Sequence, residues 1–259
     1  MQALSIHTLP ARRGFFNSSR ESVAMIAEHL PESVKKYLSG TFAEAYYWKT
    51  IRIKTPFVER RFQTTVSTVE LSIPEYADQW YSKVHEPKLG SELSDILSPE
   101  TVFFDIGSQY GYFIEFAIQA GVPPSNIHGF EVDNARYFKF KSQCSEVGVN
   151  LENKRVCNRT DGDFISIDRY SSERSSPDVV KIDVEDGEAE VVSGMKQTLS
   201  SESPIVFVEM HPSTLSDLGY SKEDIYAIFN NYDYSMAVTN HRKQSANWVS
   251  TGQESRVQS

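Results

Sequence analysis

Short apolar runs and longer segments with helical spacing alternate along the second part of the chain. The apolar runs predict strands at residues 102–105, 127–131, 154–157, 179–183 and 205–210. Segments with helical spacing follow four of them, at residues 111–120, 134–148, 188–199 and 221–230. Such alternation predicts an α/β fold with a parallel sheet, whose strands end at one shared rim. Residues 234–239 and 246–250 read as a closing hairpin.

The first hundred residues show a weaker pattern that mixes both kinds of element. A capping box at Ser18-x-x-Glu21 predicts helices between residues 18 and 40, and an aromatic-rich stretch follows at residues 42–57. A strand is predicted at 66–73 and a helix at 88–97. We therefore expect an α+β extension over residues 1–98 that contributes to an acceptor pocket. The α/β domain is expected at 99–251, followed by a polar tail at 252–259 that frays.

Composition narrows the class of protein but not its chemistry. The chain of 259 residues contains 39% hydrophobic residues and no run of eighteen apolar residues, so no membrane span is expected. The N-terminus is not followed by a long apolar segment, which argues against a signal peptide. Cys144 and Cys157 are the only cysteines and are expected to be core thiols rather than a disulfide. These features favour a cytoplasmic enzyme.

The net charge of −9 is unevenly distributed. Residues 1–61 carry a formal charge of +5, which leaves −14 on the rest of the chain. An acidic main domain argues against general nucleic-acid binding. The basic leading segment is best explained as a solvated surface, and the alternative is contact with an acidic acceptor or membrane surface.

A glycine-containing turn follows the first strong strand. Val102–Asp105 ends in an acid, Gly107 and Gly111 come next, and the almost continuously apolar segment 112–118 predicts a buried helix. Ligands of open α/β sheets bind at the carboxyl ends of such strands. Glycine serves where the backbone must turn sharply or approach a ligand closely.

A second acid, Glu131, ends the next strand, where a ribose diol is held in dinucleotide-binding folds. The first turn, however, has the pattern Gly-x-x-x-Gly and lacks the Gly-x-Gly-x-x-Gly pattern that holds a pyrophosphate. A nucleoside ligand without a diphosphate therefore fits better, and S-adenosylmethionine is the best candidate.

Four blocks carry a resemblance to a known family. They are Phe104-Asp105-Ile106-Gly107 through Gly111, Gly129-Phe130-Glu131, Lys181-Ile182-Asp183-Val184-Glu185 with Glu188, and Val206-Phe207-Val208-Glu209-Met210-His211-Pro212. In this order they resemble FkbM-family class I methyltransferases. The resemblance covers roughly residues 102–238, and its most distinctive part is the block that begins at Lys181.

The resemblance implies a Rossmann-like class I methyltransferase sheet, mostly parallel with the last strand antiparallel, and S-adenosylmethionine as cofactor. Asp105 would lie near the methionyl ammonium, directly or through water, and Glu131 would accept both ribose hydroxyls. The implied cofactor-binding residues are Asp105, Gly107, Ser108, Gln109, Tyr110, Gly111, Glu131 and Asp183.

Acids and a histidine at the later strand ends are the candidates for proton transfer. In extended chain, residues two apart face the same side, so Asp183 and Glu185 are expected to share a face. Glu209 and His211 have the same spacing. Our hypothesis is that Glu185, Glu209 or His211 is the general base. Glu188 is at least as well explained as an acid in the first turn of a helix.

Buried charge and metal binding complete the expectations for this region. Lys181 lies in an apolar strand and needs an acidic partner, expected on a neighbouring strand. No metal-ligating residues are predicted, although Asp186 adds negative charge that could favour a cationic acceptor or a metal.

Three departures from the family pattern keep other functions open. Ser108-Gln109 replaces Ala-Asn, Asp186-Gly187 replaces Gly-Ala, and the link from Cys157 to Ser166 is short, which predicts a reduced wall on the adenine side. The favoured function is an O-methyltransferase that acts on a hydroxyl or carboxylate of a sugar, glycan or small natural product. The alternatives are a catalytically silent relative that binds cofactor weakly or not at all, and a nicotinamide-dependent oxidoreductase.

Overall fold

The computed structural model describes residues 56–75, 77, 81, 85–144, 147–184, 186–241 and 247–253. Nearly all of them belong to one compact unit, formed by residues 58–73 and 77–259. Its described helices are too short or too polar to cross a bilayer. The helices predicted between residues 18 and 40 lie outside the described residues, as does almost all of the aromatic-rich stretch. The domain boundary near residue 98 stays a prediction.

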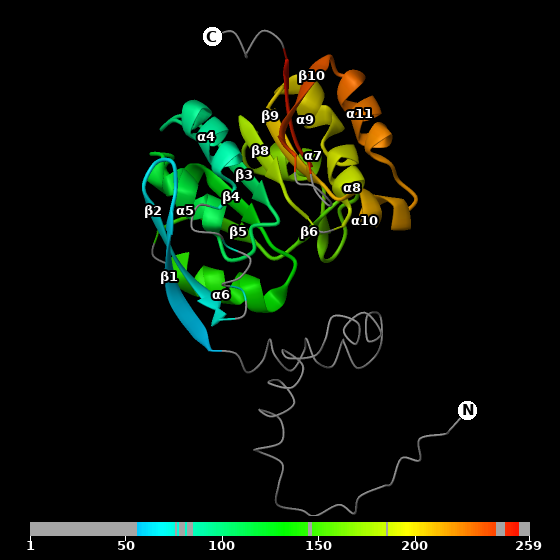
Figure 1. The fold of residues 1–259 in the computed structure, drawn as a ribbon. Helices are drawn as coiled ribbons and strands as arrows, with labels where there is room; N and C mark the ends of the chain where they lie inside the picture. Colours follow the sequence, from blue (N-terminus) through cyan, green and yellow to red (C-terminus); the bar gives the residue numbers. More distant parts are fainter. Residues whose placement is uncertain are drawn as a thin grey trace, which may run out of the picture. The chain divides into compact units, whose positions relative to one another are not determined.

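A seven-stranded sheet forms the centre of the described unit, with the order β10-β11-β9-β8-β3-β4-β5 (Figure 1). Strands β9, β8, β3, β4 and β5 are parallel, and β11 runs antiparallel between β9 and β10. This order confirms the predicted Rossmann-like class I methyltransferase sheet. In chain order, its strands are β3 (Phe103–Ile106), β4 (Ile127–Phe130), β5 (Asn150–Glu152), β8 (Val179–Ile182), β9 (Ile205–Met210), β10 (Tyr234–His241) and β11 (Asn247–Gln253).

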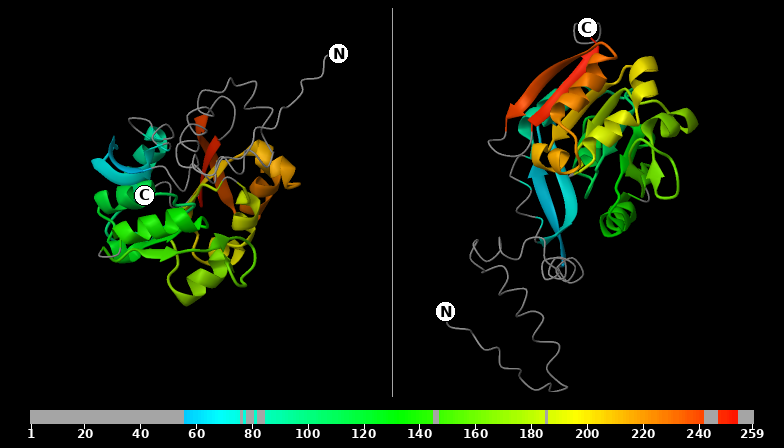
Figure 2. Two further views of the ribbon diagram at one scale, coloured as in Figure 1. Left: turned by 90° about the horizontal axis from the view of Figure 1, so that it is seen from below. Right: turned by 90° about the vertical axis from the view of Figure 1, so that its right-hand side faces the viewer.

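Helices cover both faces of this sheet (Figures 1 and 2). Apolar side chains of α7, α8, α9 and α11 pack with those of β3, β8 and β9 in one core. In the views, α4, α5 and α6 lie on the other side of the sheet. The helices are α4 (Pro87–Ile96), α5 (Tyr112–Gln119), the 3₁₀ helix η2 (Pro124–Asn126), α6 (Asn134–Cys144), α7 (Ile167–Glu173), α8 (Glu188–Ser193), α9 (Lys196–Ser201), α10 (Pro212–Asp217) and α11 (Lys222–Asn230).

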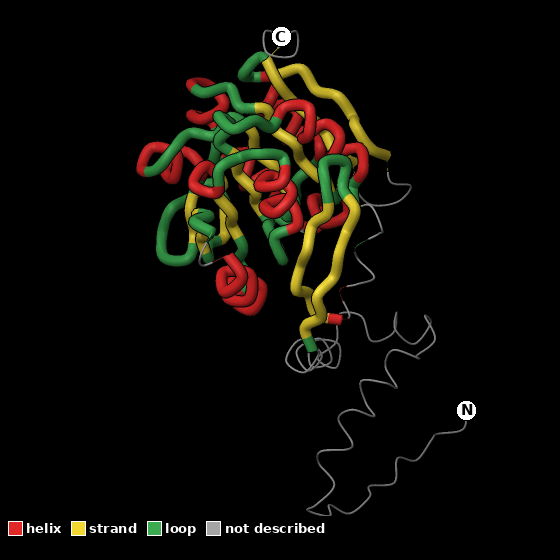
Figure 3. Tube along the Cα trace, turned by 90° about the vertical axis from the view of Figure 1, so that its left-hand side faces the viewer, coloured by secondary structure: helices red, strands yellow, loops and turns green. Residues whose placement is uncertain are grey.

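Two small sheets accompany the main one. A separate two-stranded ribbon consists of β1 (Phe57–Gln63) and β2 (Thr68–Pro74) and is seen from the side in Figure 3. The strands β6 (Arg155–Val156) and β7 (Phe164–Ile165) pair in parallel. The predicted strand near 154–157 therefore exists, but it does not belong to the main sheet.

The structure corrects several predicted elements. The edge strand β5 was not predicted, because Asn150–Glu152 contains a single apolar residue and has no strand pattern. The helix predicted at 188–199 is two helices, broken at Gly194, where a Cβ atom would lie 2.1 Å from the Cys157 carbonyl oxygen. The helix predicted at 134–148 is shorter, since α6 ends at Cys144 and the exposed Val147 lies beyond it.

Other predictions of local structure are confirmed. The helix predicted at 221–230 forms as α11 and begins with a capping box, in which Ser221 and Asp224 each accept a hydrogen bond from the other's backbone N–H. Cys144 and Cys157 are both buried and free. Strand β3 is buried on every residue, as expected for a central parallel strand with helices on both faces.

A buried histidine on β4 makes folding stability sensitive to acid. His128 is within hydrogen-bonding distance of Tyr170 through Nδ1 and of Ser175 through Nε2. Burial, assisted by Arg174, lowers the pKa of His128 to about 4. Between the unfolded value of about 6.5 and this pKa, the unfolded chain binds a proton that the folded chain does not. This contribution therefore destabilises the fold as the pH falls through that window.

We expect wild type to lose about 2 kcal/mol more unfolding free energy than a His128→Gln variant between pH 7 and pH 4.5. The reason is that glutamine does not titrate. Urea denaturation at the two pH values measures the difference, and equal losses in both proteins would show that His128 is not the source.

Candidate functional site

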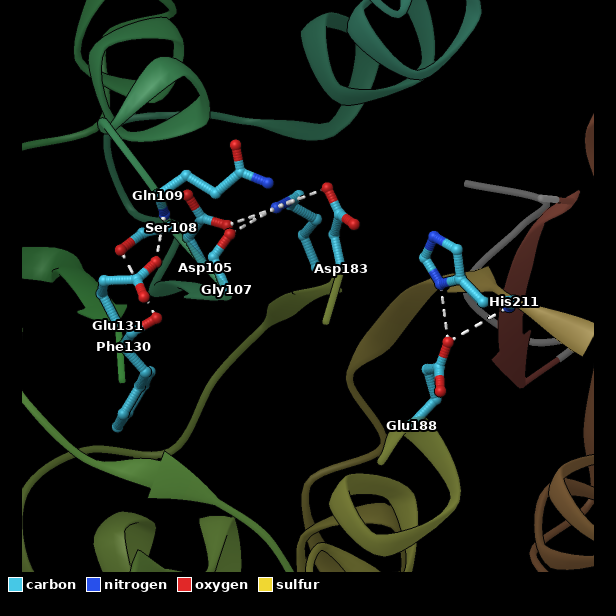
Figure 4. Close-up of polar contacts among 10 residues, drawn as sticks. Asp105, Gly107, Ser108, Gln109, Phe130, Glu131, Asp183, Glu188 and His211 are labelled. Carbon is cyan, nitrogen blue, oxygen red and sulfur yellow. Dashed lines mark hydrogen bonds and ion pairs between the residues drawn. The ribbon is translucent and has the colours of Figure 1, made fainter. Parts of the chain in front are cut away.

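Three predicted carboxylates lie at the carboxyl ends of neighbouring strands, as Figure 4 shows. Asp105 belongs to β3, while Glu131 and Asp183 directly follow β4 and β8. Glu131 and Asp183 line a common hollow, but Asp105 is fully buried and does not line it. The three residues thus share one rim, with Asp105 set beneath the other two.

The turn after β3 is tied to the end of β4. The backbone N–H groups of Gly107 and Ser108 both donate to the Phe130 carbonyl oxygen, at 2.9 and 3.0 Å. The N–H of Gln109 donates to Glu131 Oε2 at 2.8 Å. Gln109 has φ = 49°, a left-handed conformation that is uncommon for a residue other than glycine. These bonds hold the turn against the neighbouring strand.

Glu131 connects two loops through its side chain. While Oε2 accepts from Gln109, Oε1 accepts from the N–H of Asp133 at 2.7 Å. Burial raises the pKa of Glu131, and the two backbone donors and Arg136 oppose that shift. A carboxylate offers about four acceptor positions, so two of them are left for a ligand.

The hollow beside this carboxylate, called the first hollow here, has a volume of about 160 Å³. Its walls come from the turns after β3, β4 and β8 and from the segment around β6. It is lined by Ile106, Gly107, Gln109, Phe130, Glu131, Val132, Arg136, Lys154, Arg155, Val156, Asp183, Val184 and Asp186.

Lys181 has the acidic partner that its sequence position predicted. Its Nζ lies 2.8 Å from Asp105 Oδ1 and 3.6 Å from Asp183 Oδ2, and both Lys181 and Asp105 are almost completely buried. Burial opposes the charged form of Lys181, but nearby carboxylates outweigh burial and raise its pKa. The ammonium group therefore bridges the acids of β3 and the turn after β8.

A second hollow, of about 230 Å³, adjoins the first and shares Gly107, Gln109 and Asp183 with it. Aromatic side chains form one part of its wall. Charged and titratable side chains form another part, among them acids, Lys181 and His211. It is lined by Tyr81, His85, Glu86, Gly107, Ser108, Gln109, Tyr112, Phe113, Lys181, Asp183, Glu209 and His211.

Glu209 and His211 both line the second hollow, and each interacts with a different acidic side chain. Burial, together with the hydrogen-bonded carboxyl group of Asp183, raises the pKa of Glu209 to about 8. His211 Nδ1 lies 2.7 Å from Glu188 Oε1, and the backbone N–H of His211 donates to the same oxygen at 3.1 Å. Figure 4 shows the other ring nitrogen pointing away from Glu188.

Some predicted site residues lie away from the hollows. Gly111 and Tyr110 line neither one. A Cβ atom at Gly111 would lie 2.1 Å from the Phe140 ring, so this glycine permits the packing of α6. Glu185 lies outside the described residues, and its role stays a prediction.

Sequence reasoning missed much of the lining of both hollows. The aromatic wall of the second hollow includes Tyr112 and Phe113, which were predicted to belong to a buried helix, and Tyr81, which belongs to the extension expected to contribute to an acceptor pocket. Arg136, Lys154 and Arg155 reach the first hollow from segments with no motif. The sequence offered one signal for these three residues, namely that their segments follow predicted strands of the sheet.

Comparison with protein families gives one match that bears on this geometry. The model of the methyltransferase FkbM domain matches residues 149–236. This part of the chain is similar to FkbM-family methyltransferases. The matched part includes Asp183, Glu188, Glu209 and His211, whereas the turn at 107–109 and Glu131 precede it. No curated protein matches the chain significantly.

Many solved structures are similar to this chain at low sequence identity. The FkbM methyltransferase of Methylobacillus flagellatus KT is 15% identical, with a TM-score of 0.48, and the match covers 61% of this chain and 45% of that one. The magnesium protoporphyrin IX methyltransferase of Synechocystis PCC 6803, solved with bound SAM, is 13% identical, with a TM-score of 0.41, covering 64% and 74%. A precorrin-6y C5,15-methyltransferase from Geobacter metallireducens GS-15 is 15% identical, with a TM-score of 0.43, covering 66% and 88%. The chain thus spans less than half of the Methylobacillus protein.

Proposed function

We propose that the protein is an S-adenosylmethionine-dependent O-methyltransferase, acting on a hydroxyl or carboxylate of a sugar, glycan or small natural product. One observation carries the proposal. The Glu131 carboxylate lines the same hollow as the Gly107 turn and Asp183, and it has acceptor positions left after binding two backbone N–H groups.

The hydrogen-bond acceptors of the first hollow fit a nucleoside that carries a charged amine. The remaining lone pairs of Glu131 suit the two O–H donors of a ribose diol. Asp183 lies where the two hollows meet, so its carboxylate suits the ammonium of the methionyl part. Asp105 is fully buried and bonded to Lys181, so it would act on that ammonium through Lys181, Asp183 or water.

The turn itself argues against a dinucleotide. Binding of a pyrophosphate uses backbone N–H groups at such a turn. Here the N–H groups of Gly107 and Ser108 donate to Phe130, and that of Gln109 donates to Glu131. Because these donors are already used within the protein, the nicotinamide-dependent alternative is disfavoured.

S-adenosylmethionine, when bound, supplies a methyl group on a positively charged sulfur. The protein must hold the acceptor in line with that methyl group, and such positioning can supply up to roughly 7–11 kcal/mol of barrier reduction. The aromatic wall of the second hollow would position the acceptor and exclude water. An acceptor hydroxyl also has to lose its proton, and Glu185, Glu209 and His211 are the candidates to assist.

Binding of S-adenosylhomocysteine, followed by isothermal titration calorimetry, tests the proposal. We expect the wild-type chain to bind it and not NAD. A Glu131→Ala variant is expected to bind about 10- to 100-fold more weakly, because a charge-assisted contact contributes roughly 1.5–3 kcal/mol.

Glu202→Gln is the matched control, since it removes an exposed acid on the same domain and should leave the affinity unchanged. Absence of measurable binding to the wild type would favour the catalytically silent alternative. Binding of NAD instead would favour the oxidoreductase.

A further inference from the structure

Three potential metal ligands meet at the ends of two neighbouring strands. Asp183 follows β8, and Glu209 and His211 lie at the end of β9. Each offers one ligand atom, and these atoms all lie within 4.8 Å of one another. Metal–ligand bonds of about 2.0–2.2 Å place neighbouring ligand atoms about 3–4 Å apart. Small torsional changes of Asp183 and His211, which are only partly buried, would close the remaining distance.

A fourth residue outside this cluster supports its interpretation as a metal site. Glu188 is fully buried, and its Oε1 lies 2.7 Å from His211 Nδ1. Its other oxygen, Oε2, is buried and has no hydrogen-bond partner among the described residues. Metal-binding histidines usually donate their second ring N–H to a carboxylate in this way, which leaves the other nitrogen for the metal. A buried carboxylate in this position also requires positive charge nearby.

The charges around the second hollow are unbalanced. Asp183 and Glu209 line the hollow, and Asp105 and Glu188 contact Lys181 and His211, which line it too. Lys181 forms ion pairs with Asp105 and Asp183. A divalent cation bound between these carboxylates would compensate the negative charge that Lys181 leaves.

We propose that Asp183, Glu209 and His211 bind a divalent transition metal ion, with Glu188 orienting the imidazole. One nitrogen and two carboxylate oxygens suit Mn²⁺ or Zn²⁺. This inference rests on the proposed function and changes the roles given there. Glu209 and His211 then act as ligands and not as bases, and Asp183 serves both the metal ion and the methionyl ammonium through its two carboxylate oxygens. When bound, the metal ion would make an acceptor hydroxyl more acidic, so that it would lose its proton to water. Its oxygen would then bond to the methyl carbon as the carbon–sulfur bond of the cofactor breaks, which leaves a neutral thioether.

Titration of the metal-free full-length chain with Mn²⁺, followed by electron paramagnetic resonance of the free ion, tests the site. We expect one Mn²⁺ bound per chain and competition by Zn²⁺. His211→Gln and Glu209→Gln are each expected to weaken binding at least tenfold, and Glu188→Gln about 10- to 100-fold through loss of orientation. Glu190→Gln is the matched control, because Glu190 lies on the same helix and faces Arg155.

Absence of a bound Mn²⁺ in the wild type would overturn the inference. So would equal weakening by Glu190→Gln, or unchanged affinity in both His211→Gln and Glu209→Gln. S-adenosylhomocysteine binding, measured in the same proteins, verifies that each variant is folded and keeps the two proposals separate. Cofactor binding without Mn²⁺ binding rejects the metal site alone, whereas Mn²⁺ binding without cofactor binding rejects the proposed cofactor.

Discussion

A Gly107→Ala variant is expected to lose about 3–5 kcal/mol of unfolding free energy and measurable binding of S-adenosylhomocysteine. A Cβ atom at this position would lie 1.9 Å from the Asp183 backbone carbonyl oxygen. That oxygen belongs to the backbone, so the clash is relieved only if the ends of β3 and β8 move apart. Gly107 also has φ = +82°, which adds strain for any residue with a side chain.

Gly148→Ala is the control that separates these two effects. Gly148 has φ = +91°, but nothing lies within 4 Å of a Cβ atom built there. Its substitution should therefore cost only the conformational strain, about 1–2 kcal/mol. Chemical denaturation of both variants measures the difference. Equal losses would show that the close approach of Gly107 to Asp183 does not matter for stability.

A Lys181→Met variant is expected to lose about 3–5 kcal/mol of unfolding free energy. Its ammonium group lies 2.8 Å from Asp105 Oδ1, and both side chains are at most 2% exposed. Removing the lysine leaves a buried carboxylate without its charge partner, and such a charge is costly in a medium of low polarity. Urea denaturation followed by circular dichroism gives the measurement.

The double variant Asp105→Leu/Lys181→Met tests whether the cost arises from the unpaired charge. Replacing both members of a buried ion pair by apolar residues is often neutral, so the double variant should recover most of the lost stability. If the two substitutions instead destabilise additively, packing around Lys181, and not the isolated charge of Asp105, explains the loss.

The sequence predicted those parts of the fold whose residues follow a simple rule. Strand β3 is a continuous apolar run, as burial on both faces requires, and it was found within one residue of its position. Strand β5 was missed because it lies at the sheet edge, where Asn150 and Glu152 are tolerated. Its place in the sheet depends on pairing with β4, and pairing leaves no local sequence signal.

In the candidate site, too, some residues could be placed from the sequence and others could not. Glu131 and Asp183 could be placed at one rim because each directly follows a parallel strand. The bond between His211 and Glu188 could not be predicted, because it depends on how the first turn of α8 approaches the end of β9. The aromatic wall of the second hollow likewise depends on Tyr81, which precedes the sheet in the chain.

The position of β11 has a consequence for synthesis of the chain. This strand is the last in sequence order, yet it lies between β9 and β10 and pairs with both. Until residues 247–253 have left the ribosome, the hydrogen-bonding groups along one side of β9 lack their final partner. Nascent chains would therefore expose an open strand edge until these residues emerge, and an open edge can pair with the edge of another chain.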